Sequence, residues 1–264
     1  MSGWNPWHGC LKYSEGCENC YVYRIDASFG RDASVIIKTK DIDLPRRKKR
    51  DGSFALSAGE NVFTCLSSDF FLEKADEWRD EAWKMIRARQ DVRFHIITKR
   101  ILRAEQCFPE DWGEGYPNVA IGCTVENQLR ADERLPVFLD LPIASRFVVC
   151  EPLLGQVDLS GYLQTGKIEK VIAGGESGPE ARMCDFSWFQ ALQRQCIDAG
   201  VEFHFKQTGA EFCKDGKIYH INRSQQSRQA KRAGIDHKPE GAKYIWHPGK
   251  NEYADDGQMS IKNF

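Results

Sequence analysis

Short apolar runs alternate with helix-like stretches along the chain, and this alternation limits the fold more than any other feature. Each run is rich in β-branched or aromatic residues and is followed by a polar turn and a stretch with helical periodicity. The runs cover residues 61–66, 93–98, 118–122, 146–150, 170–174 and 201–205. All but the last are nearly continuous in apolar residues, which is typical of parallel strands covered on both faces.

The alternation predicts an α/β fold. With a further short strand expected near residues 4–7, the strands fit a partial or complete (β/α) TIM-like barrel better than a sandwich or a helical bundle. A doubly wound open sheet is the main alternative. We expect a barrel domain over residues 1–208 and, where the alternation fades, a C-terminal extension of short strands and a surface helix over residues 209–264, packed on the barrel.

Four helices are expected between these strands. The clearest follows the first run, where apolar side chains recur at steps of four and three and mark one buried face. Its members are Phe71, Ala75, Trp78, Ala82 and Met85. Asp69 is a suitable N-cap for this helix. A second helix is expected to begin at Asp185 and to end before Gly200, and shorter ones are expected near residues 100–107 and 128–139.

Charge and hydropathy argue against two classes of protein. The 264 residues contain 37 Lys and Arg against 38 Asp and Glu, a net charge of −1, which disfavours nucleic-acid binding driven by the whole surface. A local basic groove stays open, and the basic run at residues 45–52 is interpreted as a solvated loop, with phosphate contact as the alternative. No apolar run is long enough to span a bilayer, and the N-terminus lacks a secretory pattern, so we expect a cytoplasmic protein without a membrane partner.

The chain has ten cysteines, which in the absence of an export signal are expected to be thiols or metal ligands. Only Cys10, Cys17 and Cys20 are grouped, with the spacing C-x6-C-x2-C. A structural zinc site usually has four protein ligands, whereas three thiolates on a cubane iron–sulfur cluster leave one iron open to a small molecule. The alternative is a zinc ion with His8 as fourth ligand, although a single residue separates His8 from Cys10.

Functional groups are expected after the carboxyl ends of parallel strands. These positions are Ser67, Ser68, Asp69, Lys99, Arg100, Thr124, Glu126, Glu151, Gly175, Glu176, Ser177, Lys206 and Gln207. For the glutamates a helix cap or a salt-bridge partner is the alternative interpretation, and for the lysines a solvated side chain. The pair Gly174 and Gly175 would let the backbone come close to a ligand beside Glu176.

The segment from Trp4 to Tyr21, which runs from WNPWHGC to GCENCY, resembles the signature of a phage-associated family of uncharacterised proteins that occurs with a three-Cys-motif partner protein. That family is itself similar to the radical SAM superfamily. Further matches lie at residues 97–100, 122–127, 150–155, 174–178 and 205–209. The resemblance spans most of the chain, although the first gap between cysteines is six residues where the superfamily usually has a shorter one.

The resemblance implies a barrel of radical SAM type in which Cys10, Cys17 and Cys20 bind a 4Fe-4S cluster and S-adenosylmethionine completes the fourth iron. An electron from a donor such as flavodoxin or ferredoxin would cleave this cofactor to a 5′-deoxyadenosyl radical. The substrate is unknown, and nucleotide or nucleic-acid modification is the expected class. The residues expected to contact the cofactor are Ser67, Ser68, Asp69, Lys99, Glu126, Glu151, Gly174, Gly175 and Glu176.

Two of these expectations are more specific. By strand order, Ser67 to Asp69 would lie near the methionine amine and Glu126 near the ribose. The Gly174-Gly175-Glu176 sequence is similar to the methionine-binding GGE element of the superfamily, but it follows a late strand rather than an early one, so we do not equate the two. A zinc-stabilised nucleic-acid-binding module and a non-catalytic iron–sulfur partner protein are the alternative functions.

Overall fold

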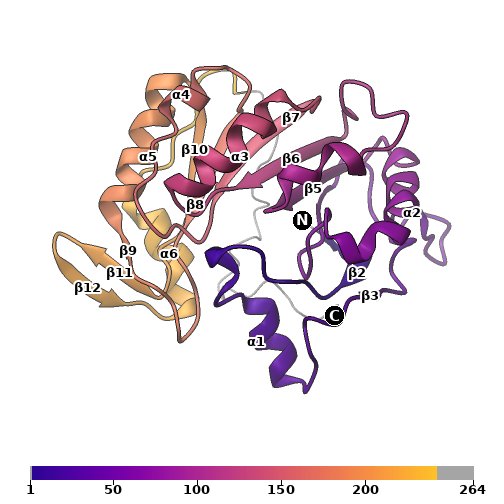
Figure 1. The fold of residues 1–264 in the computed structure, drawn as a ribbon, viewed down its shortest axis with the longest axis horizontal. Coiled ribbons are helices and arrows are strands. Elements are labelled where there is room, and N and C mark those ends of the chain that lie inside the picture. The colour runs from indigo at the N-terminus through magenta and orange to yellow at the C-terminus, as the bar shows by residue number, and fades with distance from the viewer. Residues whose placement is uncertain (1, 243–264) are drawn as a thin grey trace. The chain divides into compact units, whose positions relative to one another are not determined.

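The main sheet consists of parallel strands: every pair of neighbouring strands with a defined register is parallel. In the computed structural model, which describes residues 2–242, its strand order is β1-β4-β5-β6-β7-β8-β10 (Figure 1). The strands are β1 (Ser2–Trp4), β4 (Asn61–Thr64), β5 (Arg93–Thr98), β6 (Val119–Thr124), β7 (Ser145–Cys150), β8 (Lys170–Gly174) and β10 (Glu202–Gln207). The parallel pairs are β1–β4, β4–β5, β5–β6, β7–β8 and β8–β10.

The strand order follows the chain without a reversal. A doubly wound sheet has a point at which the order reverses, whereas a (β/α) barrel adds each strand beside the previous one. The seven-stranded sheet is therefore consistent with a partial TIM-like barrel, which confirms the predicted fold class. The six apolar runs each form a strand, and β6 and β8 are buried along their whole length.

The chain divides into two compact units. Within the described residues, the first unit comprises residues 2–123 and 136–146, and the second comprises residues 124–135 and 147–242. The division into residues 1–208 and 209–264 that the sequence suggests stays a prediction, and its last part, from residue 243, lies outside the described residues.

Two of the helices predicted in the first unit are shorter in the structure than the sequence suggests. Its elements outside the main sheet are β2 (Trp7–His8), η1 (Glu15–Cys17), α1 (Tyr21–Ser28), β3 (Ile37–Lys38), η2 (Leu44–Arg46), η3 (Glu73–Ala75), α2 (Asp76–Arg87), η4 (Ile101–Arg103) and η5 (Glu105–Cys107). The helix expected near residues 100–107 is thus two successive 3-10 turns, and α2 begins at Asp76 rather than just after Asp69.

The buried face of α2 also differs from the prediction. Ala82 is buried as expected, but Trp78 and Met85 are partly exposed, and Trp83 and Ile86 are buried in their place. Trp83 packs at the centre of an aromatic cluster formed with Phe70, Phe108, Trp112 and Tyr116. The helical periodicity of the sequence is compatible with burial of either of two neighbouring faces of α2. Packing in the aromatic cluster buries the face that carries Trp83.

Elements of the second unit agree more closely with the sequence. They are α4 (Ser160–Leu163), β9 (Cys184–Asp185), α5 (Phe186–Ala199), β11 (Glu211–Lys214), β12 (Lys217–His220) and α6 (Arg223–Ala233), while α3 (Gln128–Asp140) runs through both units. Asp185 caps α5 by accepting a hydrogen bond from the Ser187 backbone, and Gly200 ends it in the left-handed region. The strands β12-β11-β9 form a small second sheet. The expected short strands and surface helix after residue 208 are therefore present.

Candidate functional site

The loop that carries the grouped cysteines is bound to the carboxyl end of β4 in the first unit. Gly9 N donates to Ser67 O at 3.2 Å, and Ser68 Oγ donates back to Gly9 O. Cys10 N donates to Ala33 O at 2.8 Å on the other side of the loop. These bonds place the start of the loop at the edge of a parallel sheet where functional groups are expected.

Gly9 is required by the close approach of this loop to the segment beyond α1. Its φ is +92°, in the region that favours glycine, and a Cβ added there would lie 2.4 Å from Val35 O. Any side chain at this position would therefore both strain the backbone and push the loop away from Val35.

His8 is held by a buried carboxylate beneath the loop. Its Nε2 lies 2.7 Å from Asp26 Oδ2, and Arg31 Nη2 lies 2.7 Å from Asp26 Oδ1. Asp26 is almost fully buried on α1. The contact between His8 and Asp26 joins β2 to α1. If His8 were the fourth ligand of a zinc ion, its Nε2 could not bind the metal while it is bound to Asp26.

The three thiols influence one another electrostatically. Burial and the nearby Asp69 raise the pKa of Cys10 to about 12, Arg100 opposes this, and Cys17 and Cys20 add to it. Burial also raises the pKa of Cys20, and Lys99 is among the groups that oppose the rise. Each thiol is half-buried. The loop therefore presents sheltered thiols that would release protons on binding a metal, with two cations close enough to favour the thiolates.

A single metal ion and an iron–sulfur cluster require different spacings of their ligands. Within residues 2–242, no three His, Cys, Asp or Glu side chains lie close enough together to bind one metal ion. In a cubane cluster each thiolate binds a different iron, so its ligands lie farther apart than the ligands of one tetrahedral ion. The choice between a 4Fe-4S cluster and a zinc ion at the three thiols therefore stays a prediction.

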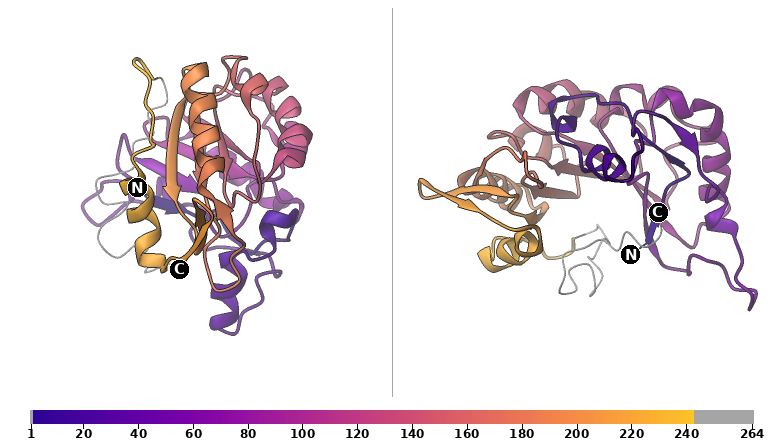
Figure 2. Two further views of the ribbon diagram at one scale, coloured as in Figure 1. Left: turned by 90° about the vertical axis from the view of Figure 1, so that its left-hand side faces the viewer. Right: turned by 90° about the horizontal axis from the view of Figure 1, so that it is seen from below.

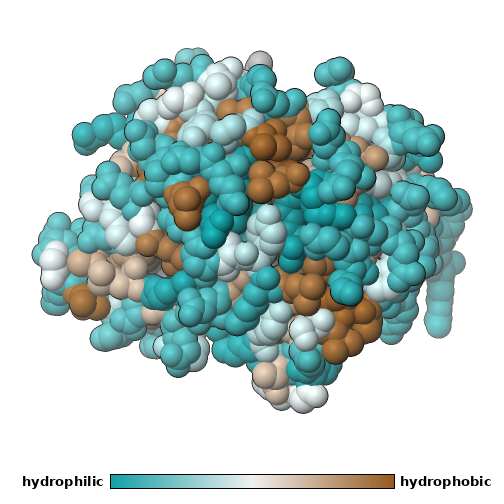
Figure 3. All heavy atoms as spheres, viewed as in Figure 1, coloured by the Kyte–Doolittle hydropathy of each residue, from teal (hydrophilic) through white to brown (hydrophobic). Residues whose placement is uncertain are grey.

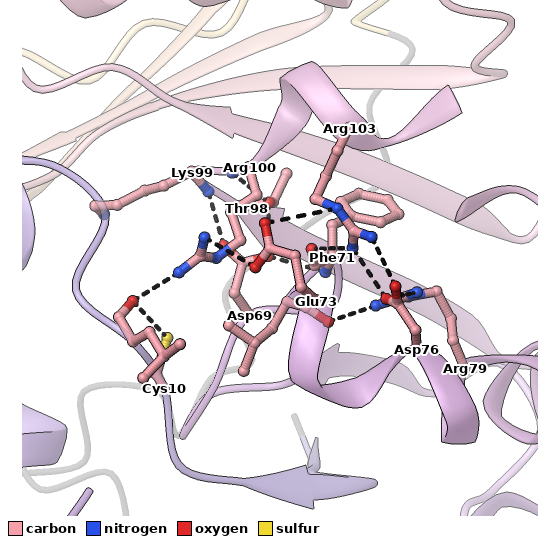
Figure 4. A network of polar contacts seen from close by, with 12 residues as sticks. Cys10, Asp69, Phe71, Glu73, Asp76, Arg79, Thr98, Lys99, Arg100 and Arg103 are labelled. Carbon is pink, nitrogen blue, oxygen red and sulfur yellow. Dashed lines mark hydrogen bonds and ion pairs between the residues drawn. The ribbon is translucent and has the colours of Figure 1, made fainter. Parts of the chain in front are cut away.

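Asp69 joins the ends of the two strands behind the loop. Its Oδ1 accepts hydrogen bonds from Phe71 N at 2.9 Å and Thr98 Oγ1 at 2.7 Å, and its Oδ2 accepts one from Lys99 N at 2.9 Å (Figure 4). The predicted role as N-cap of the following helix is wrong, because α2 begins only at Asp76. Asp69 instead fixes the carboxyl end of β4 against that of β5.

Arg100 connects the end of β5 to the cysteine loop, a role that the sequence did not reveal. Its Nη2 donates to Leu11 O at 2.7 Å, and Nη1 lies 3.3 Å from Glu73 Oε2 (Figure 4). The guanidinium lies 4.6 Å from the centre of the Tyr13 ring. The only sequence signal was its place as the second cation after an apolar strand. The side chain is 5% exposed, so a buried positive charge stands beside the thiols.

Two hydroxyls and one guanidinium nitrogen at this edge have no hydrogen-bond partner within the described residues. They are Thr64 Oγ1, Ser67 Oγ and Arg100 Nε, all buried. Buried polar atoms are usually paired, so unpaired buried atoms at the end of a strand are available to a polar ligand. Ser67, Ser68, Asp69 and Lys99 lie together at the ends of β4 and β5, where the cysteine loop is bound, and their role in cofactor binding stays a prediction.

Glu126 and Glu176 of the second unit are already paired with arginines. Glu126 Oε2 lies 2.8 Å from Arg134 Nη1, and both side chains are completely buried. Glu176 receives hydrogen bonds from the Arg182 backbone and guanidinium, the shortest at 2.6 Å. The alternative interpretation of these residues, salt-bridge partners that stabilise the fold, accounts for both contacts.

Glu151 and the two glycines pack together at the ends of β7, β8 and β10. Glu151 Oε2 lies 2.8 Å from Lys206 Nζ, and Oε1 accepts from Gln207 Nε2 at 2.8 Å. A Cβ on Gly174 would lie 3.0 Å from Glu151 Oε1, and one on Gly175 would lie 2.3 Å from Thr208 O. Close packing of neighbouring strands therefore accounts for the double glycine without a ligand.

Comparison with protein families identifies the family to which the chain belongs. The profile of a family described as "Protein of unknown function (DUF5131)" matches residues 1–243. The chain belongs to this family. The match includes the cysteine loop and all the strand ends described above, and it confirms the expected membership of an uncharacterised family. The phage association and the likeness to radical SAM proteins stay predictions.

Searches of curated proteins and of solved structures give no match for the chain. Among the helices of residues 2–242, none combines the length and the apolar character that a membrane crossing requires. The partial TIM-like barrel is a fold on which many enzymes are built, and the site alone must therefore support a more specific function.

Proposed function

We propose that this member of the DUF5131 family is a radical SAM-like iron–sulfur enzyme that binds a 4Fe-4S cluster through Cys10, Cys17 and Cys20 and cleaves S-adenosylmethionine reductively. The observation that carries the proposal is the attachment of the three-thiol loop to the carboxyl end of β4 by Gly9, beside Ser67 and Ser68. In a (β/α) barrel this is the edge at which active sites are found.

The chemistry that such a cluster supplies is the one-electron reduction of S-adenosylmethionine to methionine and a 5′-deoxyadenosyl radical. Residues around the cysteine loop would support the binding of the cluster. Arg100 binds the loop through Leu11 O and offsets the negative charge of the thiolates. The half-buried setting of the thiols limits access of water and other hydrogen donors.

Ser67 and Lys99 are our candidates for direct contact with S-adenosylmethionine. Ser67 Oγ is buried and has no partner within the described residues, and Lys99 lies close enough to Cys20 to oppose the rise in its pKa that burial causes. Asp69 has three hydrogen bonds that fix the strand ends, so we assign it a positioning role. An electron donor such as flavodoxin or ferredoxin, a three-Cys-motif partner protein and a nucleotide or nucleic-acid substrate belong to the same proposal.

Anaerobic purification followed by measurement of iron, sulfide and 5′-deoxyadenosine tests the proposal. We expect a brown protein with about four irons per chain, and 5′-deoxyadenosine after addition of dithionite and S-adenosylmethionine. Replacing Cys10, Cys17 or Cys20 with alanine should abolish both iron binding and cleavage. Cys213→Ala, which changes a cysteine on β11 of the second unit, is the matched control and should retain both.

The outcomes separate the alternatives. Zinc-loaded, colourless protein that gives no 5′-deoxyadenosine would overturn the proposal in favour of the zinc module. A stable cluster without any cleavage of S-adenosylmethionine would overturn the catalytic part and favour the non-catalytic iron–sulfur partner.

A further inference from the structure

A strongly basic segment lies in the second unit, remote in sequence from the cysteine loop. Residues 214–232 contain six Lys or Arg side chains and a single acidic one, Asp215, whereas the whole chain has a net charge of −1. The segment comprises the turn and second strand of the β11–β12 hairpin together with α6, which Figures 1 and 2 show beside each other. We call residues 214–232 the basic surface.

The helix α6 presents its cations on one side. Arg228, Lys231 and Arg232 are exposed at helical spacing, while Gln226 and Ala230, at a spacing of four, are buried. Cations near a helix C-terminus are often explained by the helix dipole. That explanation covers Lys231 and Arg232 in the last turn, but it does not cover the cations of the hairpin or the absence of any acidic residue from the helix.

The basic surface is firmly held. Thr208 N donates to Gln226 O at 3.4 Å, Gln226 Nε2 donates to Ile221 O at 3.0 Å, and Ile221 N donates to Ala210 O at 2.7 Å. These bonds connect the start of α6 to the segment after β10. A surface fixed in this way loses little conformational entropy when it binds a ligand.

The hairpin adds apolar and aromatic groups to the cations. Every residue of β12 is exposed, with Ile218 54% and Tyr219 40% exposed. Lys217 Nζ lies 5.2 Å from the centre of the Tyr219 ring. In Figure 3, isolated apolar side chains interrupt a hydrophilic surface where Figure 1 places the hairpin. A base can stack on such a ring while neighbouring cations contact phosphates.

Cations of the basic surface differ from most arginines of the first unit. Lys214, Lys217, Lys231 and Arg232 form no ion pair with any other residue in the range 2–242. In the basic run at residues 45–52, Arg47 is paired with Asp41 and Asp43, and the other four cations of that run form no ion pair within the described residues. Cations without an ion pair therefore occur in both segments, and the basic surface differs in carrying them on a helix and a neighbouring hairpin.

We propose that the basic surface binds single-stranded nucleic acid, with the cations of α6 and the hairpin on the phosphates and Tyr219 stacked on a base. An anionic membrane fits less well, because α6 exposes no large apolar side chain that could insert into a lipid interface. The proposal rests on charge, exposure and ring geometry, and it holds whether or not the cysteine loop binds a cluster.

Fluorescence anisotropy with a labelled oligothymidylate, titrated with the full-length protein at several salt concentrations, tests the proposal. We expect binding that weakens as salt increases, and a double variant Lys231→Glu, Arg232→Glu that binds at least tenfold more weakly. Removing two phosphate contacts should also reduce the slope of log affinity against log salt by about 1.4. The matched control, Lys74→Glu with Lys84→Glu, reverses two exposed lysines of the first unit and should bind like the parent.

Tyr219→Ala separates stacking from charge. It should weaken binding about fivefold or more, as loss of one stacked base does, without changing the salt slope. Circular dichroism melts of each variant confirm that the fold is retained, and Arg228→Gln provides a milder test of the helix face. Equal loss in the control double variant, a Tyr219→Ala protein with unchanged affinity, or tighter binding of a duplex than of the single strand would each overturn the proposal.

Discussion

The two units place ionisable residues at equivalent positions, just after the carboxyl ends of parallel strands, but give them different partners. In the second unit, Glu126 is fully buried against Arg134 and Glu151 is bound by Lys206 and Gln207. In the first unit, the strand ends are bonded to a separate loop that carries three thiols, and the Ser67 hydroxyl has no partner within the described residues.

The position of an ionisable residue after a strand does not by itself indicate whether the residue binds a ligand; its partners in the structure do. A charge at a strand end that already has a well-placed partner contributes to folding, and a ligand would have to displace that partner. A strand end whose polar atoms are unpaired, or that is joined to a loop of metal-binding residues, has capacity left for a ligand. The comparison therefore supports the proposal of a ligand site in the first unit, and stabilisation of the fold accounts for the Glu–Arg pairs of the second.

The largest effect that tests the comparison concerns Arg134. Arg134→Met would remove the cation that lies 2.8 Å from Glu126 Oε2 and leave that carboxylate completely buried. We expect a loss of about 3–5 kcal/mol in the free energy of unfolding, measured by urea denaturation of the protein. Iron content per folded chain should stay unchanged.

A double variant Glu126→Leu, Arg134→Met removes both charges and is the control. It should recover much of the stability, because an apolar pair of similar volume can replace a buried ion pair. A stable Arg134→Met protein that fails to bind S-adenosylmethionine would reverse the assignment and place Glu126 in the cofactor site.

Gly9→Ala tests the first unit. The new methyl group would meet Val35 O, and the backbone would be held in the left-handed region, at a local cost of about 1–3 kcal/mol. We expect the loop to leave its place at the end of β4, and iron content after anaerobic reconstitution to fall severalfold.

Gly30→Ala is a control for the backbone effect. Gly30 has a φ of +66° with nothing within 4 Å of an added Cβ, so the substitution strains the backbone without a steric collision. Iron content should then be close to that of the parent. Equal iron content in Gly9→Ala and in the parent would show that the docked loop is not needed for metal binding.

Much of the fold could be predicted because each parallel strand carries its own signal. A strand buried on both faces is nearly continuous in apolar residues, so β6 and β8, which are buried along their whole length, are recognisable without knowledge of their neighbours. The helix α2 was harder, because Trp78 and Trp83 both fit a helical period, and only the aromatic cluster around Trp83 decides between the two faces.

The three thiols of the candidate site could be predicted from the sequence, but the contacts that hold the surrounding residues in place could not. The grouping of Cys10, Cys17 and Cys20 is local in sequence. Asp69, however, was predicted from its neighbours to cap a helix, whereas its partners Thr98 and Lys99 lie about thirty residues away. Local patterns do not contain such long-range partners, and for the same reason the contact between Arg100 and Leu11 O was not foreseen.

The smallest expected effect concerns Ser67. Ser67→Ala removes a buried hydroxyl whose Oγ has no partner within the described residues, so the free energy of unfolding should change by less than about 0.5 kcal/mol or rise slightly. If that hydroxyl contacts S-adenosylmethionine, equilibrium dialysis with the reconstituted protein should show affinity reduced about fivefold, the value of one neutral hydrogen bond. Glu126→Gln, the corresponding conservative change at a strand end of the second unit, should leave the affinity per folded chain unchanged. A reduced affinity for Glu126→Gln with none for Ser67→Ala would contradict the comparison directly, because it would put the ligand beside the paired carboxylate rather than beside the unpaired hydroxyl.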